Sequence, residues 1–209
     1  MRNPVLYDIS PTVGPDAPLF PGDHPYALRW TARIAGGSSV NLSAMELSPH
    51  VGAHADAPLH YADGAASIEA VDLLPYLGPC RVIHAIGCGP LVRVEHLQRA
   101  ERGLPPRVLV RTCLRAATAW DPGFTAYDPR ALQWLGERGV RLAGIDTPSV
   151  DPADSKGLDA HHTLLRLDMR VLENLVLDDV PEGDYELIAL PLKLAGACAS
   201  PVRAVLRAL

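Results

Sequence analysis

The alternation of apolar and polar residues divides this chain into strands near its start and alternating strands and helices later. Between residues 40 and 47, for example, Val40, Leu42 and Ala44 alternate with polar or larger side chains, which is typical of a strand with one buried face. A loop rich in proline and glycine covers residues 11–25. Patterns of this kind predict strands over residues 5–8, 28–34, 40–47, 81–86, 107–112, 140–145, 171–175 and 185–192.

Apolar residues at helical spacing predict four helices. Ser67 is a candidate cap for a short helix over 67–77, because Ile68, Val71 and Leu74 would share one face. The other helices are expected over 94–102, over 129–138 after the cap Asp128, and from Asp159 onward. Strands that come first and later alternate with helices indicate an α/β protein with a mixed sheet and packed helices. We expect residues 1–209 to form a single domain.

Residues 50–60 form a segment with an unusual distribution of polar groups. His50, His54, Asp56 and His60 all stand at even positions, whereas the odd positions hold valine, alanine and leucine. One side of the segment is therefore apolar, and the other carries almost only nitrogen and oxygen ligands. Such a concentration favours a metal site over a strand with surface histidines.

Neither regular element explains this segment. In a helix, Asp56 would lie about 200° around the axis from His54. In a straight strand, His50 and His54 would be separated by about 13 Å. Two ligands of one ion therefore require the chain to curl, and Gly52 stands between them with access to backbone angles that other residues avoid.

Composition and charge exclude several classes of protein. The 209 residues are 48% hydrophobic and 21% charged, which provides a substantial core. A net charge of -5 and only 5% aromatic residues argue against nucleic-acid binding. No segment approaches 18 apolar residues, the first residues lack a signal-peptide core, and the four cysteines show no C-x-x-C pair. We therefore expect a cytoplasmic protein with reduced thiols, no membrane partner and no nucleic-acid partner.

A second group of possible ligands lies far along the chain. His161 and His162 stand at a predicted helix start, and Glu173 lies in a predicted strand beside Leu172 and Leu175. Burying a glutamate costs about 3 kcal/mol or more unless it is paired or bound to a metal. Taken alone, these residues fit an ordinary helix start and a surface carboxylate. Their spacing does not link them to His50, nor does it choose between His161 and His162.

The ordered motif in residues 50–60 also resembles that of a known family. His50-x-Gly-x-His54-x-Asp56-x-Pro58-x-His60 is similar to the signature of the metal-dependent cyclase-like hydrolases, and more closely to that of the bacterial kynurenine formamidases, or arylformamidases. The resemblance extends over nearly the whole chain. It includes the blocks at 7–10, 20–23, 144–149, 160–161, 172–175 and 199–204.

The resemblance implies a fold, an assembly and a set of metal ligands. The fold would be a swivelling β/β/α domain, and the assembly a homodimer. The site would hold two zinc ions per subunit. His50, His54 and Asp56 would bind the first zinc; Asp56 would bridge to a second zinc bound by His161 and Glu173.

The resemblance also implies an activity. His60 would transfer a proton, and Phe20 would contact the aromatic ring of the substrate. The reaction would be hydrolysis of N-formyl-L-kynurenine to L-kynurenine and formate in tryptophan degradation. A related hydrolase that opens a cyclic amide or lactone such as isatin is the first alternative, and a metal-binding module without catalysis is the second. A serine hydrolase is disfavoured, because the chain has no G-x-S-x-G motif.

Some positions depart from the family pattern. Ala53 replaces a threonine that is common in the wider family, and Phe20 stands where a tryptophan is frequent. Cys198 stands where an aspartate is expected, and we predict a small buried thiol there. The metal itself stays open, because sites of histidine and carboxylate also accept manganese or cobalt.

Overall fold

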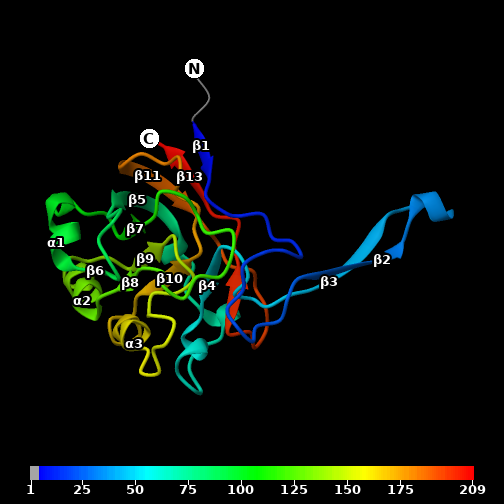
Figure 1. Cartoon of the computed structure of the whole chain (residues 1–209), viewed down its shortest axis with the longest axis horizontal. Helices are drawn as coiled ribbons and strands as arrows, with labels where there is room; N and C mark the ends of the chain where they lie inside the picture. Colours follow the sequence, from blue (N-terminus) through cyan, green and yellow to red (C-terminus); the bar gives the residue numbers. More distant parts are fainter. Residues whose placement is uncertain (1–4) are drawn as a thin grey trace.

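The core of the protein is a mixed β-sheet, which we describe from a computed structural model covering residues 5–209 (Figure 1). Within this part of the chain the sheet has nine strands. The central neighbours β5, β7, β9 and β10 pair in parallel, and all other pairs in the sheet are antiparallel. In spatial order the strands are β1 (Leu6–Asp8), β13 (Val205–Ala208), β11 (Gly183–Ile188), β5 (Leu77–His84), β7 (Arg107–Arg111), β9 (Leu142–Ile145), β10 (Arg170–Glu173), β4 (His54–Asp56) and β12 (Ala199–Pro201).

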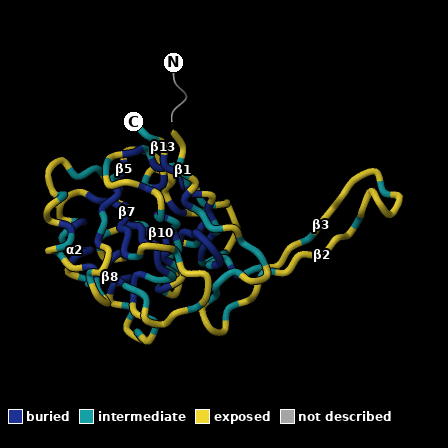
Figure 2. The backbone as a smooth tube through the Cα atoms, turned by 45° about the horizontal axis from the view of Figure 1, so that its top comes forward, coloured by how far each residue is buried: buried dark blue, intermediate teal, exposed yellow. Residues whose placement is uncertain are grey.

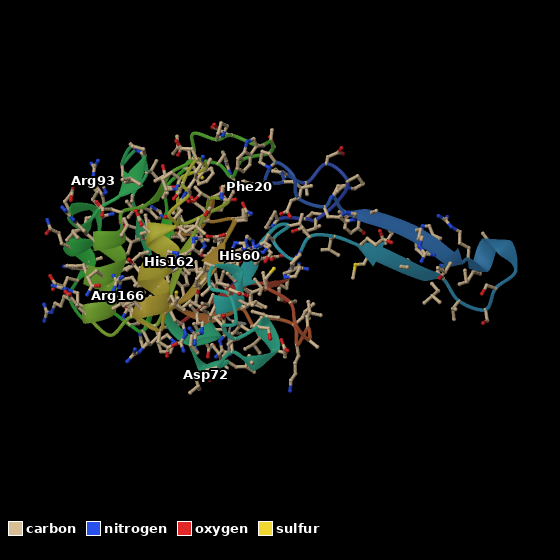
Figure 3. The ribbon with its side chains drawn as sticks, turned by 90° about the horizontal axis from the view of Figure 1, so that it is seen from below. Phe20, His60, Asp72, Arg93, His162 and Arg166 are labelled. Carbon is tan, nitrogen blue, oxygen red and sulfur yellow. The ribbon has the colours of Figure 1, made fainter. Side chains whose placement is uncertain are left out.

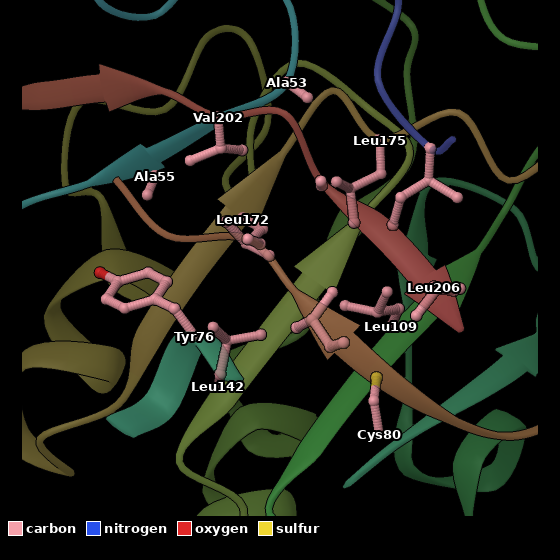
Figure 4. Packing of buried hydrophobic residues seen from close by; sticks show 14 of the residues in the cluster. Ala53, Ala55, Tyr76, Cys80, Leu109, Leu142, Leu172, Leu175, Val202 and Leu206 are labelled. Carbon is pink, nitrogen blue, oxygen red and sulfur yellow. The ribbon is translucent and has the colours of Figure 1, made fainter. Parts of the chain in front are cut away.

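The central strands β7 and β9 are buried on both faces of the sheet. Successive side chains of a strand point to opposite sides, so one strand contributes to two cores. In β7, Val108 and Val110 join the core beneath the helices, whereas Leu109 joins the core on the other face (Figure 4). The helices α1 (Val94–Leu97), α2 (Pro129–Glu137) and α3 (Asp159–Arg166) cover the first of these faces (Figure 1). Within the described residues, no helix is long and apolar enough to traverse a bilayer.

A two-stranded arm projects away from this core (Figures 1 and 2). It consists of β2 (Ala27–Ala32) and β3 (Leu42–Glu46), which pair antiparallel, with the 3₁₀ turn η1 (Ile34–Gly36) at its tip. Most of its residues are exposed, and several of these are large and apolar (Figure 2). A second small pair, β6 (Leu91–Val92) and β8 (Ala126–Tyr127), lies parallel beside the helices.

The mixed α/β architecture is confirmed, and most predicted elements are present with shifted ends. The helix predicted over 67–77 is wrong. In its place are the 3₁₀ turns η3 (Ile68–Ala70) and η4 (Leu74–Tyr76), and Val71 between them is extended with φ -71° and ψ 148°. Pro75 explains the difference, because it lacks the N–H that a helix would bond to the carbonyl of Val71, and its ring would clash with that carbonyl. The predicted helix over 94–102 is shorter, since α1 passes into the 3₁₀ turn η5 (Gln98–Ala100).

The curl predicted around Gly52 is confirmed. Gly52 has φ +67°, and the imidazole rings of His50 and His54 lie only 5.0 Å apart between centroids. The backbone of Gly52 also packs closely against the 11–25 loop, because a Cβ atom there would lie 2.6 Å from Cγ2 of Val13. Both the backbone angle and the lack of space therefore require glycine at this position.

We expect Gly52→Ala to lower the free energy of unfolding by about 2–4 kcal/mol, because left-handed strain and overpacking add together. Gly64→Ala is a matched control: Gly64 has φ +71°, but a Cβ atom added there would meet nothing within 4 Å. It should cost only about 1–2 kcal/mol of strain. Adding Val13→Ala to Gly52→Ala should recover part of the loss in urea unfolding. If Gly52→Ala and Gly64→Ala lower the free energy of unfolding equally, close packing at Gly52 does not contribute to its requirement for glycine.

Candidate active site

Strand pairing brings two of the predicted ligands face to face. His54 in β4 lies directly opposite Glu173 in β10, and Asp56 lies opposite Ala199 in β12. Because side chains alternate along a strand, His54 and Asp56 point to the same face. His54 and Asp56 are each 1% exposed, and Glu173 is 3% exposed. The sheet therefore holds two carboxylates and an imidazole in the interior.

The curl adds His50 to this group. Its Nδ1 lies 3.0 Å from Oδ1 of Asp56. Nε2 of His54 lies 3.5 Å from the same oxygen and 3.2 Å from Oε2 of Glu173. The Nδ1 of His54 lies 2.9 Å from the carbonyl oxygen of Gly52, so the turn that curls the chain also orients this ring.

Helix α3 brings His161 to the other side of Asp56. Its Nε2 lies 3.3 Å from Oδ2 of Asp56 and 3.5 Å from Oε1 of Glu173. His161 is buried, whereas the neighbouring His162 is exposed on the same helix (Figure 3). The geometry therefore favours His161 over His162 as the residue that faces the site.

The charges in this cluster stabilise one another. Burial raises the pKa of Asp56, but the surrounding histidines outweigh it and keep that pKa well below its ordinary value. Burial opposes protonation of His54, yet the carboxylates of Glu173 and Asp56 raise its pKa to about 9. Burial likewise opposes protonation of His161, but Asp151 and Asp56 raise its pKa to about 10. Without a metal ion, these two rings therefore carry protons at neutral pH.

These residues fit a metal ion. Nε2 of His54 and Oδ1 of Asp56 are fully buried and make no hydrogen bond within the described part of the chain. Buried polar atoms are normally satisfied, so two such atoms aimed into one space indicate a missing ligand. Imidazole nitrogens and carboxylate oxygens are the donors that zinc prefers beside thiolates. Three groups of close ligand atoms meet here, namely His50–His54–Asp56, Asp56–His60–His161 and His50–His60–Cys198.

His60 lies at the open side of the cluster. It ends the 3₁₀ turn η2 (Pro58–His60), and its ring centroid lies 4.2 Å from that of His50 and 5.8 Å from that of His161. His60 is exposed to solvent, whereas His54 and His161 are buried. Partial burial and the positive charges of the other histidines lower its pKa. His60 is therefore a neutral imidazole at pH 7 with access to solvent.

A pocket of about 430 Å³ opens onto these histidines. Phe20 lines it together with His50, His60 and His161, and Figure 3 shows Phe20 and His60 near the base of the arm. Trp120 also lines the pocket and packs edge-on against Phe20, with ring centroids 4.7 Å apart. Sequence reasoning missed Trp120, because it stands in an irregular loop with no motif around it.

Two further residues hold the histidine rings, and sequence reasoning missed both roles. Asp151 accepts hydrogen bonds from the backbone N–H groups of Ala160 and His161 and lies 2.7 Å from Nδ1 of His161. Cys198 was expected to be a small buried thiol, and the burial is less than expected. Its side chain is partly exposed, and Sγ lies 3.4 Å from Nε2 of His50. The curl places the outer edge of the His50 ring against the start of β12, which no local pattern reveals.

This chain is similar to known proteins over most of its length. The family model described as "Putative cyclase" matches residues 7–152. The chain is also 65% identical over 205 residues to the kynurenine formamidase of Bordetella pertussis, with 98% of each chain covered. This chain belongs to the kynurenine formamidases of the cyclase family. It is thus an enzyme of the hydrolase class.

Solved structures of the cyclase family share the fold. A predicted metal-dependent hydrolase from Bacillus stearothermophilus superposes with a TM-score of 0.84 at 26% identity, covering 99% of each chain. Isatin hydrolase A from Labrenzia aggregata superposes with a TM-score of 0.84 at 22% identity, covering 98% of this chain and 93% of the other. The second likeness concerns the fold alone. Both structures therefore share the overall fold of this chain.

The raised pKa values of His54 and His161 predict that zinc binding releases protons. In this kynurenine formamidase both rings are protonated at pH 7, and a metal ion binds only the neutral ring. We expect zinc binding to release about two protons per chain at pH 7, and this number should decrease toward zero above about pH 10. The apparent affinity for zinc should rise with pH over the same range. Calorimetry in buffers with different ionisation enthalpies measures this number.

Asp151→Asn provides the control for this measurement. The variant loses a carboxylate that raises the pKa of His161, so fewer protons should be released at pH 7. Zinc binding without proton release in the wild-type protein would contradict the charge state described above.

Proposed function

We propose that this protein hydrolyses N-formyl-L-kynurenine to L-kynurenine and formate with zinc as its metal, as a step of tryptophan degradation by the kynurenine pathway. The observation that carries the proposal is the position of His60 beside five buried or half-buried candidate ligands. That arrangement occurs in a chain 65% identical to the kynurenine formamidase of Bordetella pertussis. The name of the relative indicates the substrate. The arrangement of side chains contains the groups that amide hydrolysis needs.

The ligand assignment follows the distances in the cluster. His50, His54 and Asp56 would hold one zinc ion; Asp56, His161 and Glu173 would hold a second, with Asp56 between them. When bound, zinc lowers the pKa of a water molecule from about 15.7 toward about 7 and stabilises negative charge on a carbonyl oxygen. The two oxygens of Asp56 already face different histidines, which suits a bridging carboxylate.

His60 moves the proton in this proposal. Because its pKa is lowered, the ring is neutral at pH 7 and takes a proton as water attacks the formyl carbon. It then delivers that proton to the aniline nitrogen as the C–N bond breaks. The nitrogen leaves as a neutral amine, which is necessary because an anilide anion is a poor leaving group. One water is consumed, and the products are L-kynurenine, formate and one proton released to solvent.

The aromatic side chains of the pocket favour an aryl substrate. Phe20 and Trp120 pack against each other and line the same pocket as His60. Aromatic pairs prefer edge-to-face or offset contacts, so a third ring can pack against them. The substrate's benzene ring would contact this pair and direct its formyl group toward His60. Trp120 thereby provides the large ring that Phe20 does not.

The arm suggests how two copies assemble. An isolated two-stranded ribbon is marginally stable in water, yet this one exposes six large apolar side chains: Leu28, Trp30, Ile34, Val40, Leu42 and Met45. Apolar surface of this kind marks a contact site. We therefore include a homodimer in the proposal, with the arm as part of its interface. The four cysteines are unpaired, which suits the reducing cytoplasm in which we place it.

We expect His60→Ala to reduce formate release from N-formyl-L-kynurenine by about 10²–10⁴-fold, because proton transfer to the leaving nitrogen is lost. Its zinc content, measured by elemental analysis, should stay at the wild-type value. His162→Ala removes an exposed histidine outside the pocket and should leave the rate unchanged. A zinc-loaded His60→Ala enzyme with near-full activity would disprove the assigned role.

The same assay separates the alternative functions. Faster hydrolysis of isatin than of N-formyl-L-kynurenine by the purified wild-type protein would favour the opening of cyclic amides. Binding of two zinc equivalents with no hydrolysis of either substrate would favour a metal-binding module.

A double variant tests the dimer. Leu28 and Met45 lie directly opposite each other on the arm, so Leu28→Glu with Met45→Glu places two charges on one face of the ribbon. We expect a shift from dimer to monomer in light scattering coupled to size-exclusion chromatography. Arg29 pairs with Ala44 and points to the other face of the ribbon. Arg29→Glu should therefore leave the mass unchanged. A wild-type monomer would contradict the assembly.

A further inference from the structure

The three buried or half-buried histidines of the site differ in what holds their outer ring nitrogen. Nδ1 of His54 lies 2.9 Å from a backbone carbonyl, and Nδ1 of His161 lies 2.7 Å from the Asp151 carboxylate. The outer nitrogen of His50 is instead Nε2, which lies 3.4 Å from Sγ of Cys198. Two rings are thus held by oxygen acceptors, and the third by a sulfur atom.

The orientation of the His50 ring determines the direction of this hydrogen bond. Its Nδ1 faces Oδ1 of Asp56 at 3.0 Å, although that oxygen has no hydrogen-bond partner among the described residues. A metal ion bound here would meet a lone pair from each of these two atoms. A neutral imidazole carries one proton, so a bare Nδ1 requires the proton on Nε2. The sulfur of Cys198 must then accept, and its own S–H must point elsewhere.

The backbone fixes Cys198 in this place. Its carbonyl oxygen accepts a hydrogen bond of 2.9 Å from the N–H of Ala57, and the following residue, Ala199, pairs with Asp56. The sheet therefore positions the Cβ of Cys198 beside the His50 ring regardless of the side chain. Substitutions at position 198 change the group that meets Nε2 while these backbone hydrogen bonds persist.

We propose that Cys198 is a positioning residue: its sulfur accepts the Nε2 proton of His50 and so keeps Nδ1 free to bind metal. The inference rests on the proposed metal-dependent function. Partners of this kind fix the tautomer and orientation of metal-binding histidines. A thiol is a weak acceptor compared with a carbonyl or a carboxylate. The metal ion on the His50 side is therefore held more weakly than the one between His161 and Glu173.

The experiment measures metal affinity rather than activity. Metal-free protein is titrated with zinc in competition with a chromophoric chelator, and the two equivalents are resolved as a tighter and a weaker step. Loss of an outer hydrogen-bond partner typically costs about 10–100-fold in metal affinity. We expect Cys198→Ala to weaken the weaker step by about tenfold and to leave the tighter step unchanged. Cys198→Ser should restore part of the loss, and Cys198→Asp should exceed wild-type affinity.

Controls separate this role from others. Cys88→Ala removes a thiol that packs against the core beneath the helices, and it should match the wild-type titration. The cobalt-substituted wild-type protein should show no thiolate-to-cobalt charge-transfer band. If such a band appears and is lost in Cys198→Ser, Cys198 is a direct metal ligand and the proposal is overturned. Equal affinities in wild type and Cys198→Ala would also overturn it. Failure to hydrolyse N-formyl-L-kynurenine would contradict only the proposed function, because the titration does not involve substrate.

Discussion

Asp56 and Glu173 place two carboxylates inside the protein, where like charges repel and water does not screen them. Positive charge must therefore accompany them. In the metal-free protein it comes from His54 and His161, whose pKa values rise accordingly. The neighbouring elements meet this need for positive charge, because each supplies either a candidate ligand or a group that orients one.

These groups come from separate parts of the chain. A turn at Gly52 brings His50 beside β4, the pairing of β4 with β10 sets Glu173 opposite His54, and α3 adds His161. Each of these placements depends on a different kind of interaction: a backbone angle, a strand register and a helix packed on a sheet. The pocket lined by Phe20, Trp120 and His60 opens onto the cluster.

The sequence revealed the local part of this arrangement. The even-numbered positions of the polar residues within 50–60, and the spacing between them, were sufficient to predict the curl and the shared face of His54 and Asp56. Both features depend only on backbone geometry. The pairing of His54 with Glu173 could not be derived in that way, since a strand's partner far along the chain leaves no trace in its own pattern. Trp120 and Asp151 were missed because both stand in irregular segments, where no periodic pattern indicates which way a side chain points. The resemblance to a family, rather than physical reasoning, joined the two halves of the site.

The cross-strand pairing of His54 and Glu173 also links metal binding to folding. A shift of β4 against β10 by one residue would turn every side chain of β4 to the opposite face and separate the ligands. A metal ion can therefore bind tightly only to the correctly paired sheet. Because a ligand that binds only the folded state stabilises it by mass action, a bound metal ion would favour the native register over shifted ones.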